Sequence, residues 1–123
     1  MALIEKRSLL EVPRVSRGWG AERWVENIPE YCGKLLLLEA GKRCSLHFHK
    51  DKKETMFLVE GRVDILFVDP ETGKEYTQEL FVFDSVLIPP AQVHQIIAVE
   101  DSKLIEFSTF HREEDSYRVR KGD

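Results

Sequence analysis

The sequence reads GKRCSLHFHKDKKETMFLVEG over residues 41–61, and this stretch is the best guide to the fold. The segment that carries His47 and His49 alternates in polarity, as does the segment Thr55 to Glu60, and such alternation is typical of β-strands. The charged run KDKK, residues 50–53, separates the two segments. We therefore predict a β-hairpin whose two strands are joined by a charged turn.

Two histidines share one face of the first predicted strand. His47 and His49 are two residues apart, and side chains at positions i and i+2 of a strand point in the same direction. Glu54 follows beyond the charged turn, and the segment IPPAQVHQI, residues 88–96, brings a third imidazole into another strand. Imidazole and carboxylate groups bind divalent metal ions. The candidate metal ligands are therefore His47, His49, Glu54 and His94. The alternative is four unrelated polar residues on a sheet surface.

These residues resemble the two sequence motifs of the cupin family. The first motif is Gly, five residues, His-x-His, three or four residues, Glu, six residues, Gly. It is matched by Gly41, His47, His49, Glu54 and Gly61. The second motif is Gly, five residues, Pro-x-Gly, two residues, His, three residues, Asn. Pro89 and His94 match it, whereas Phe83, Ala91 and Ala98 replace Gly, Gly and Asn. The resemblance implies a jelly-roll barrel with an intact metal-ligand set and altered turn residues.

The pattern along the whole chain supports an all-β fold independently. Strand-like segments are separated by turns, and they cover residues 34–39, 63–68, 75–83, 86–88, 94–99 and 103–109. About eight or nine short strands without a helical period predict a small β-barrel or a double-sheet jelly roll. We expect one cupin domain over residues 1–123, with an N-terminal arm (1–30), a barrel core (31–110) and a C-terminal tail (111–123).

Composition limits the classes of partner. The chain has 123 residues, of which 42% are hydrophobic and 33% charged, as in ordinary globular domains. The net charge of −4 and the lack of a basic patch argue against a nucleic-acid partner. No apolar run approaches the roughly 20 residues that span a membrane. The charged residues Glu5 to Arg7 stand too early for a signal peptide, so we expect a cytoplasmic protein.

The two cysteines, Cys32 and Cys44, should remain reduced in that compartment. Cys44 lies three residues before His47 and would face away from the ligands in a continuous strand. We also expect a homodimer, because a small barrel must pair or cover its open sheet edges. The hydrophobic N-terminal segment is the natural edge to pair across a two-fold axis.

Two shorter resemblances point to sugar metabolism. Trp19 lies between Gly18 and Gly20, and a similar Trp-Gly element occurs in type II mannose-6-phosphate isomerases, where it would help to close the site. The run I-E-F-S-T-x-H-x-x-x-D-S-Y-R, residues 105–118, resembles the end of small cupins of sugar and sugar-phosphate metabolism. In such isomerases the matching strand carries an acidic residue, which is Glu106 in this sequence.

Glu106 interrupts an apolar strand and is costly to bury unless it is paired or functional. It is our candidate catalytic residue, with an ion pair to a Lys or Arg as the alternative. Lys52 and Arg118 are candidates for binding a substrate phosphate. His111 is either a further substrate-binding residue or an exposed loop histidine.

Three functions fit these residues. The first is a metal-dependent isomerase or epimerase of a sugar or sugar phosphate, in which Glu106 or a metal-linked water moves a proton between carbons. It requires a polar, open barrel mouth with a basic rim. The second is an iron-dependent dioxygenase with a more apolar pocket. The third is a non-enzymatic metal- or sugar-binding module. The ligand set suits one ion of Zn, Fe, Mn, Ni or Co and does not choose among them.

Overall fold

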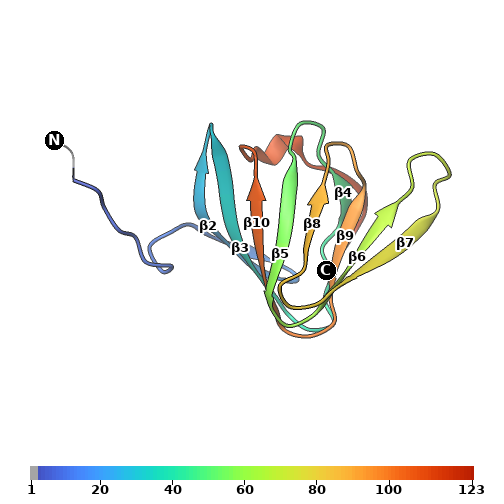
Figure 1. The fold of residues 1–123 in the computed structure, drawn as a ribbon, viewed down its shortest axis with the longest axis horizontal. Helices are drawn as coiled ribbons and strands as arrows, with labels where there is room; N and C mark the ends of the chain where they lie inside the picture. The colour runs from blue at the N-terminus through green and yellow to red at the C-terminus, as the bar shows by residue number, and fades with distance from the viewer. Residues whose placement is uncertain (1–2) are drawn as a thin grey trace.

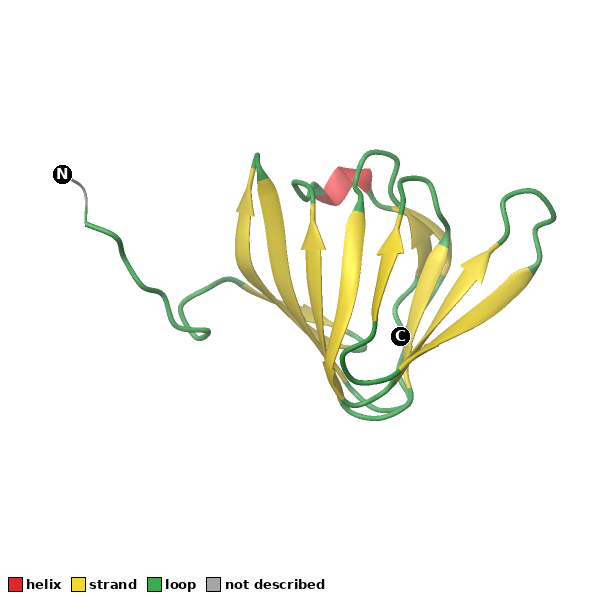
Figure 2. Cartoon of the chain, viewed as in Figure 1, coloured by secondary structure: helices red, strands yellow, loops and turns green. Residues whose placement is uncertain are grey.

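The computed structural model describes residues 3–123 and consists of two antiparallel β-sheets that enclose a common interior (Figures 1 and 2). The first sheet has the strand order β1 (Arg14–Arg17), β2 (Gly20–Ile28), β3 (Tyr31–Leu38), β10 (Ser102–Ser108), β5 (Glu54–Glu60) and β8 (Ser85–Ile88). The second has the order β11 (Tyr117–Arg120), β4 (Leu46–Phe48), β9 (His94–Ala98), β6 (Val63–Val68) and β7 (Glu75–Leu80). A short 3-10 helix, η1, covers Glu113–Asp115. The predicted all-β jelly roll is confirmed.

Alternating side chains build the interior. In β3 every second residue from Cys32 to Leu38 is buried, and the same alternation runs through β5, β6 and β10. In the apolar run KLLLLE, residues 34–39, the outward residues Leu35 and Leu37 are only half-buried. One face of this sheet therefore forms the core, and the other remains partly open to solvent.

The interior has two levels. At one level Leu104 of β10 lies between Leu36 of β3 and Leu58 of β5, and these side chains pack with Ile65 and Ile96 of the opposite sheet. One step further along the same strands, Glu106 lies between Lys34 and Met56. The first level is a dry core, whereas the second begins a polar cavity.

The chain ends are more ordered than expected. The N-terminal arm was predicted to extend to residue 30, but β1 and β2 belong to the first sheet, and β2 pairs with β3 from Gly20 to Ile28. Their pattern is hard to read because a bulge between Trp24 and Glu26 breaks the alternation. The segment outside the sheets is therefore residues 3–13, and residues 1–2 lie outside the described part. In the tail, β11 pairs with β4.

The substituted turn residues of the second cupin motif keep glycine-like backbone angles. Phe83 has φ of 74° and Ala91 has φ of 69°, in the left-handed region that side chains other than glycine adopt at a cost. Gly61, which the first motif retains, has φ of 88°, and a Cβ there would clash with the Asp101 carbonyl. The turn geometry of the motif is thus preserved although two of its glycines are absent.

Candidate metal centre and its cavity

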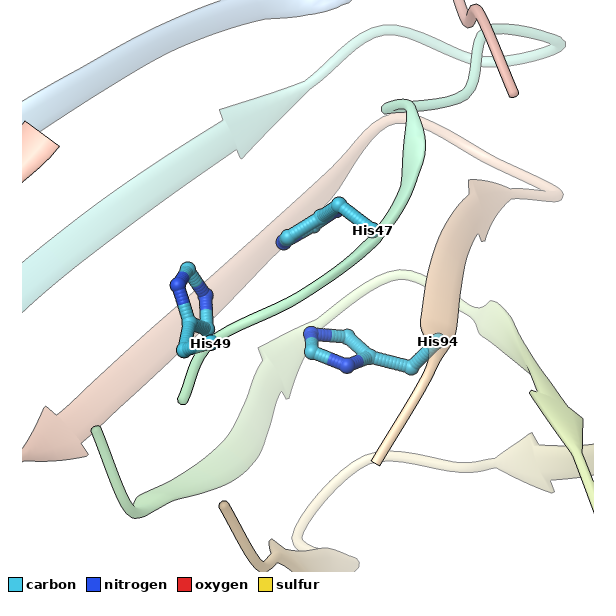
Figure 3. Close-up of side chains that lie close together, drawn as sticks. All are labelled: His47, His49 and His94. Atoms are coloured by element: carbon cyan, nitrogen blue, oxygen red, sulfur yellow. The ribbon is translucent and has the colours of Figure 1, made fainter. Parts of the chain in front are cut away.

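Three histidines converge inside the barrel at its polar level. His47 lies in β4, His49 follows that strand, and His94 begins β9 directly opposite His47. Figure 3 shows the three rings pointing into the space between these strands. One nitrogen from each ring lies within 4.8 Å of the other two. The predicted alternation therefore brings all three imidazoles to one point.

Hydrogen bonds decide which nitrogen of each ring is free. The Nδ1 atoms of His47, His49 and His94 each lie 2.8 Å from a backbone carbonyl oxygen, of Ser45, Asp115 and Gln92 respectively. A carbonyl oxygen only accepts, so each Nδ1 carries the proton and each Nε2 presents a lone pair. This arrangement orients metal-binding histidines in proteins. Burial, and then the electrostatic interaction with His94, lowers the pKa of His47 to about 3, so its ring is neutral at pH 7.

Glu54 begins β5 and is buried against two of these rings. Its Oε1 lies 3.0 Å from His94 Nε2, and its Oε2 lies 3.9 Å from His49 Nε2. Among the described residues, neither oxygen of Glu54 nor His94 Nε2 has a properly aligned hydrogen bond. Two buried acceptors that face each other repel unless a cation lies between them. The donor set therefore fits a divalent metal ion, and Glu54 as its fourth ligand stays a prediction.

Lys52 lies at the centre of a second polar group beside the histidines. Its Nζ is 2.6 Å from Glu106 Oε2, 2.9 Å from His111 Nδ1 and 3.4 Å from Glu54 Oε2. Burial alone would lower the pKa of Lys52, but the carboxylates of Glu106 and Glu54 outweigh burial and raise it. Lys52 is therefore a buried ammonium ion whose charge is largely balanced by its neighbours.

Glu106 faces the cavity, as the alternation predicted, and it is also ion-paired, as the alternative proposed. Its contacts with Lys52 Nζ and with Ser108 Oγ, the latter at 3.0 Å, are both made by Oε2. Within the described part of the chain, Oε1 forms no hydrogen bond or ion pair. This oxygen is therefore the one that a ligand in the cavity could use.

His111 is buried rather than exposed in a loop. Asn27 holds its backbone through two hydrogen bonds, of 3.0 and 2.9 Å. Its Nε2 donates to Glu113 Oε1 at 3.2 Å, while its Nδ1 accepts from Lys52. Burial, and then the ammonium groups of Lys52 and Lys34, lower the pKa of His111. It is a neutral ring that links Lys52 to the outside of the barrel.

Arg118 lies in β11 opposite His47 and is exposed at the cavity mouth. Unlike Lys52, Arg118 forms no ion pair among the described residues, so the two candidate phosphate ligands differ in their surroundings. Lys52 lies deep and paired, whereas Arg118 belongs to a basic rim with Arg17 and Lys121.

A charge network that the sequence analysis missed completes the far wall. Glu22 accepts from Arg17 Nε at 2.6 Å, from Lys34 Nζ at 3.1 Å and from Trp24 Nε1 at 3.0 Å. Burial would raise the pKa of Glu22, but Lys34 and Arg17 lower it to about 2. The sequence does contain one indication of this network, because Lys34 is a charged residue in an otherwise apolar strand. Its partner Glu22 could not be predicted, because the bulge in β2 interrupts the alternation of that strand.

Asp115 of η1 was also missed, although it supports the metal centre. Its carboxylate accepts from the backbone nitrogens of Lys50, Asp51 and Lys52, at 2.9, 3.2 and 3.1 Å. Its backbone carbonyl accepts from His49 Nδ1. Burial opposes ionisation, but these backbone donors lower the pKa of Asp115 overall. One residue therefore fixes both the turn after His49 and the orientation of the His49 ring.

Cys44 and Trp19 line the same cavity. Cys44 was expected to face away from the ligands, but the chain bends before β4, and its Sγ accepts from Ile96 N at 3.1 Å inside the barrel. Burial raises the pKa of Cys44 to about 12, so it remains a thiol. Trp19, from the Gly-Trp-Gly segment, is buried in the wall. Both Cys32 and Cys44 are free.

The cavity formed by these groups has a volume of about 770 Å³. Its basic lining residues are Arg17, Lys34, Lys52, Arg118 and Lys121, and its acidic ones are Glu22, Glu54, Glu106, Glu113 and Asp123. The apolar part of the wall consists of Trp19, Leu36, Met56 and Ile96. A space of this size and polarity suits a small, oxygen-rich molecule.

The family profile described as Cupin matches residues 34–120, and the chain belongs to the cupin family. Its fold is similar to that of oxalate decarboxylase from Bacillus subtilis, with a TM-score of 0.79 and 18% identity over 97% of this chain and 33% of the other. It is similarly close to the capsular polysaccharide assembling protein CapF from Staphylococcus aureus, with a TM-score of 0.78 and 17% identity over 89% of this chain and 34% of CapF.

The chain thus spans about a third of the length of these two proteins, and the likeness establishes the fold alone. No functionally curated protein matches the sequence. None of the helices in residues 3–123 has the length and apolar character needed to cross a membrane.

Proposed function

We propose that this cupin is a metal-dependent isomerase or epimerase of a sugar or sugar phosphate, similar to type II mannose-6-phosphate isomerases. The observation that carries the proposal is the buried pair of Lys52 and Glu106, whose charged atoms lie 2.6 Å apart beside the histidine cluster. Moving a proton between adjacent carbons requires a carboxylate or similar base close to the polarised substrate.

The roles follow from the contacts. His47, His49, His94 and Glu54 would hold a divalent ion, which when bound would polarise a carbonyl or hydroxyl oxygen. Glu106 Oε1, the oxygen without a protein partner in the described chain, would take the proton from one carbon and return it to the next. Lys52 would keep the Glu106 carboxylate in place through the bond to Oε2. His111 would position Lys52 from the other side.

Charge favours an anionic substrate. Five basic and five acidic residues line the cavity, so a divalent cation would make the loaded cavity positive. Arg17, Arg118 and Lys121 supply the basic rim that the isomerase hypothesis requires. The alternative of an iron-dependent dioxygenase is less well supported, because its apolar substrate would meet ten charged side chains.

The test is exchange of solvent deuterium into a substrate. Wild-type protein loaded separately with Zn, Fe, Mn, Ni or Co would be incubated with aldose and ketose phosphates in deuterated water and followed by NMR. We expect exchange at the carbon beside the carbonyl, and a loss of about 100-fold or more in Glu106→Gln.

The matched control is Glu60→Gln, which changes an exposed glutamate of β5 that pairs with Lys103 on the outside of the sheet. It should exchange at the wild-type rate. Exchange by Glu106→Gln at the wild-type rate would assign Glu106 a structural role. Stoichiometric metal without exchange on any substrate would favour the non-enzymatic binding module, and oxygen uptake with iron would favour the dioxygenase.

The cytoplasmic location and the homodimer stay predictions. Metal analysis of protein purified without added metal identifies the ion, which neither the ligand set nor the fold distinguishes.

A further inference from the structure

Residues 121–123, which follow β11, lie beside edges of both sheets. β1 is an edge strand of the first sheet, and β11 is an edge strand of the second. Residues 121–123 belong to neither sheet, and they line the cavity together with residues 16–19, which lead from β1 into β2. This part of the cavity wall is therefore built by irregular backbone between the two edges.

The segment 121–123 is packed against other backbone at two points. At the first, a Cβ on Gly122 would clash with the carbonyl oxygen of Cys44. At the second, a Cβ on Gly18 would clash with the backbone of Asp123. Neither glycine has a left-handed φ, so the close approach of the two chains is what excludes a side chain at both positions.

The attachment of this segment is otherwise slight. The Asp123 N–H donates to the carbonyl oxygen of Arg43 at 2.9 Å, and Asp123 Oδ2 accepts from the Arg43 N–H at 2.8 Å. The segment contains no apolar side chain, and Lys121 and Asp123 are exposed. The neighbouring turn is held more firmly, because Asp115 alone accepts three backbone hydrogen bonds there. Segments with few buried apolar contacts open at a low cost in free energy, so residues 121–123 are the part of this wall that moves most easily.

The segment covers two residues of the cavity wall. Cys44 and Ser45, whose backbone Gly122 approaches, both line the cavity. If residues 121–123 moved away, the space between β1 and β11 would become a groove that is open at this end. A groove accepts part of a long molecule, whereas an enclosed cavity accepts only molecules that fit inside it.

We infer that residues 121–123 form a strap that restricts the cavity to small ligands and excludes longer ones, such as chains of linked sugars. The strap sets this boundary at the rim, where it also carries Lys121, while the histidine cluster and Glu106 lie deeper. The inference concerns access to the cavity, so it does not depend on the reaction proposed above.

The experiment uses the two cysteines as reporters of access. Cys44 lines the cavity beneath the strap, whereas Cys32 is buried in β3 outside the cavity lining. Purified protein would be treated with N-ethylmaleimide, which is small, or with pyrenylmaleimide, which carries the same reactive group on a bulky ring system. Peptide mass spectrometry follows each thiol separately, and division by the rates for free cysteine leaves only the difference in access. No turnover is needed, so a failure of this test is distinct from a failure of the proposed isomerase.

In wild-type protein, Cys44 should react about ten times faster or more with N-ethylmaleimide than with pyrenylmaleimide, because brief opening of the strap admits the small reagent more readily. Gly122→Ala should raise the rate with pyrenylmaleimide roughly tenfold or more, because the added methyl group displaces the strap from the Cys44 carbonyl oxygen. Gly18→Ala displaces Asp123 from the other contact and should have the same effect, also where Gly122→Ala does not fold.

The matched control is Gly33→Ala, because a Cβ at Gly33 would meet no atom within 4 Å and its φ is not left-handed either. It should react as wild type does. Equal rates of Cys44 with both reagents in wild-type protein would overturn the size restriction. Wild-type rates in Gly122→Ala and Gly18→Ala would also overturn it, as would a parallel rise in the labelling of Cys32, which would indicate general unfolding and not displacement of the strap.

Discussion

The two levels of the barrel interior are built by the same strands, but one is apolar and the other is lined by charged residues and histidines. Leu104 lies between Leu36 and Leu58, whereas Glu106, two residues further along β10, lies between Lys34 and Met56 and contacts Lys52. On the opposite sheet, Ile96 of β9 belongs to the apolar core, whereas His94, two residues earlier in the same strand, belongs to the histidine cluster. The comparison teaches that this cupin has its apolar core at one level and its candidate metal centre at the next, although the same strands continue through both.

The sharpest test of this division is Leu104→Ala. Leu104 is fully buried in the dry level, so we expect a loss of about 3–4 kcal/mol in the free energy of unfolding, with metal binding retained by the folded protein. Urea unfolding and metal titration measure the two quantities. The exposed Val119→Ala should change neither. Loss of metal without loss of stability in Leu104→Ala would show that the levels are not separate.

The polar level also contributes stability, and its contribution should depend on pH. Folding lowers the pKa of Glu22 from its ordinary value of 4.5 to about 2, so the unfolded chain takes up this proton first as the pH falls. The stabilisation, about 3 kcal/mol, is complete above pH 4.5 and disappears towards pH 2.

Glu22→Gln should therefore be less stable than wild type near pH 6, and the difference should shrink as the pH approaches 2. Denaturant unfolding across this range measures it. Glu30→Gln, at an exposed position, is the control and should follow the wild-type curve. If the difference in stability between Glu22→Gln and wild type stayed constant with pH, Glu22 would not contribute to the loss of stability at low pH.

Asp115 connects the polar level to the surface, and its loss should have an intermediate effect. Asp115→Ala removes the acceptor of three backbone hydrogen bonds in the turn after His49. We expect a loss of about 2 kcal/mol in stability and roughly tenfold weaker metal binding, as for other groups that support ligands indirectly. Competition titration with a chelating dye measures the affinity. The control is Glu114→Ala, at the exposed neighbouring position, which should leave both the stability and the metal affinity unchanged. An Asp115→Ala protein with wild-type metal affinity would show that Asp115 does not position the metal ligands.

The sequence allowed the strands and the histidine cluster to be predicted because both depend on local spacing. His47 and His49 share a face by alternation, and His94 enters an adjacent strand. Glu106 was also correctly placed towards the interior by its alternation with Leu104.

What escaped prediction depends on contacts between distant segments or on irregular backbone. Glu22 and Trp24 lie beside a bulge, so alternation could not show that Glu22 lines the cavity or that Trp24 donates a hydrogen bond to it. His111 is buried because Asn27, 84 residues earlier, binds its backbone. No pattern within either segment contains that information.

The smallest predicted effect concerns the turn before β9, which contains Ala91 and leads to His94. Ala91 occupies a left-handed conformation with φ of 69°, and its N–H donates to the His49 carbonyl oxygen at 2.6 Å. Glycine adopts this backbone without the steric cost of a Cβ, but it also increases the entropy of the unfolded chain. The balance of these terms predicts that Ala91→Gly stabilises the fold by about 0.5–1 kcal/mol. Ala98→Gly is the matched opposite, because Ala98 is buried in β9 with no left-handed angle, and it should destabilise the fold by about 1 kcal/mol. Paired thermal unfolding of the two variants therefore tests whether the turn before His94 keeps the glycine geometry at a measurable cost, and equal destabilisation by both would show that it does not.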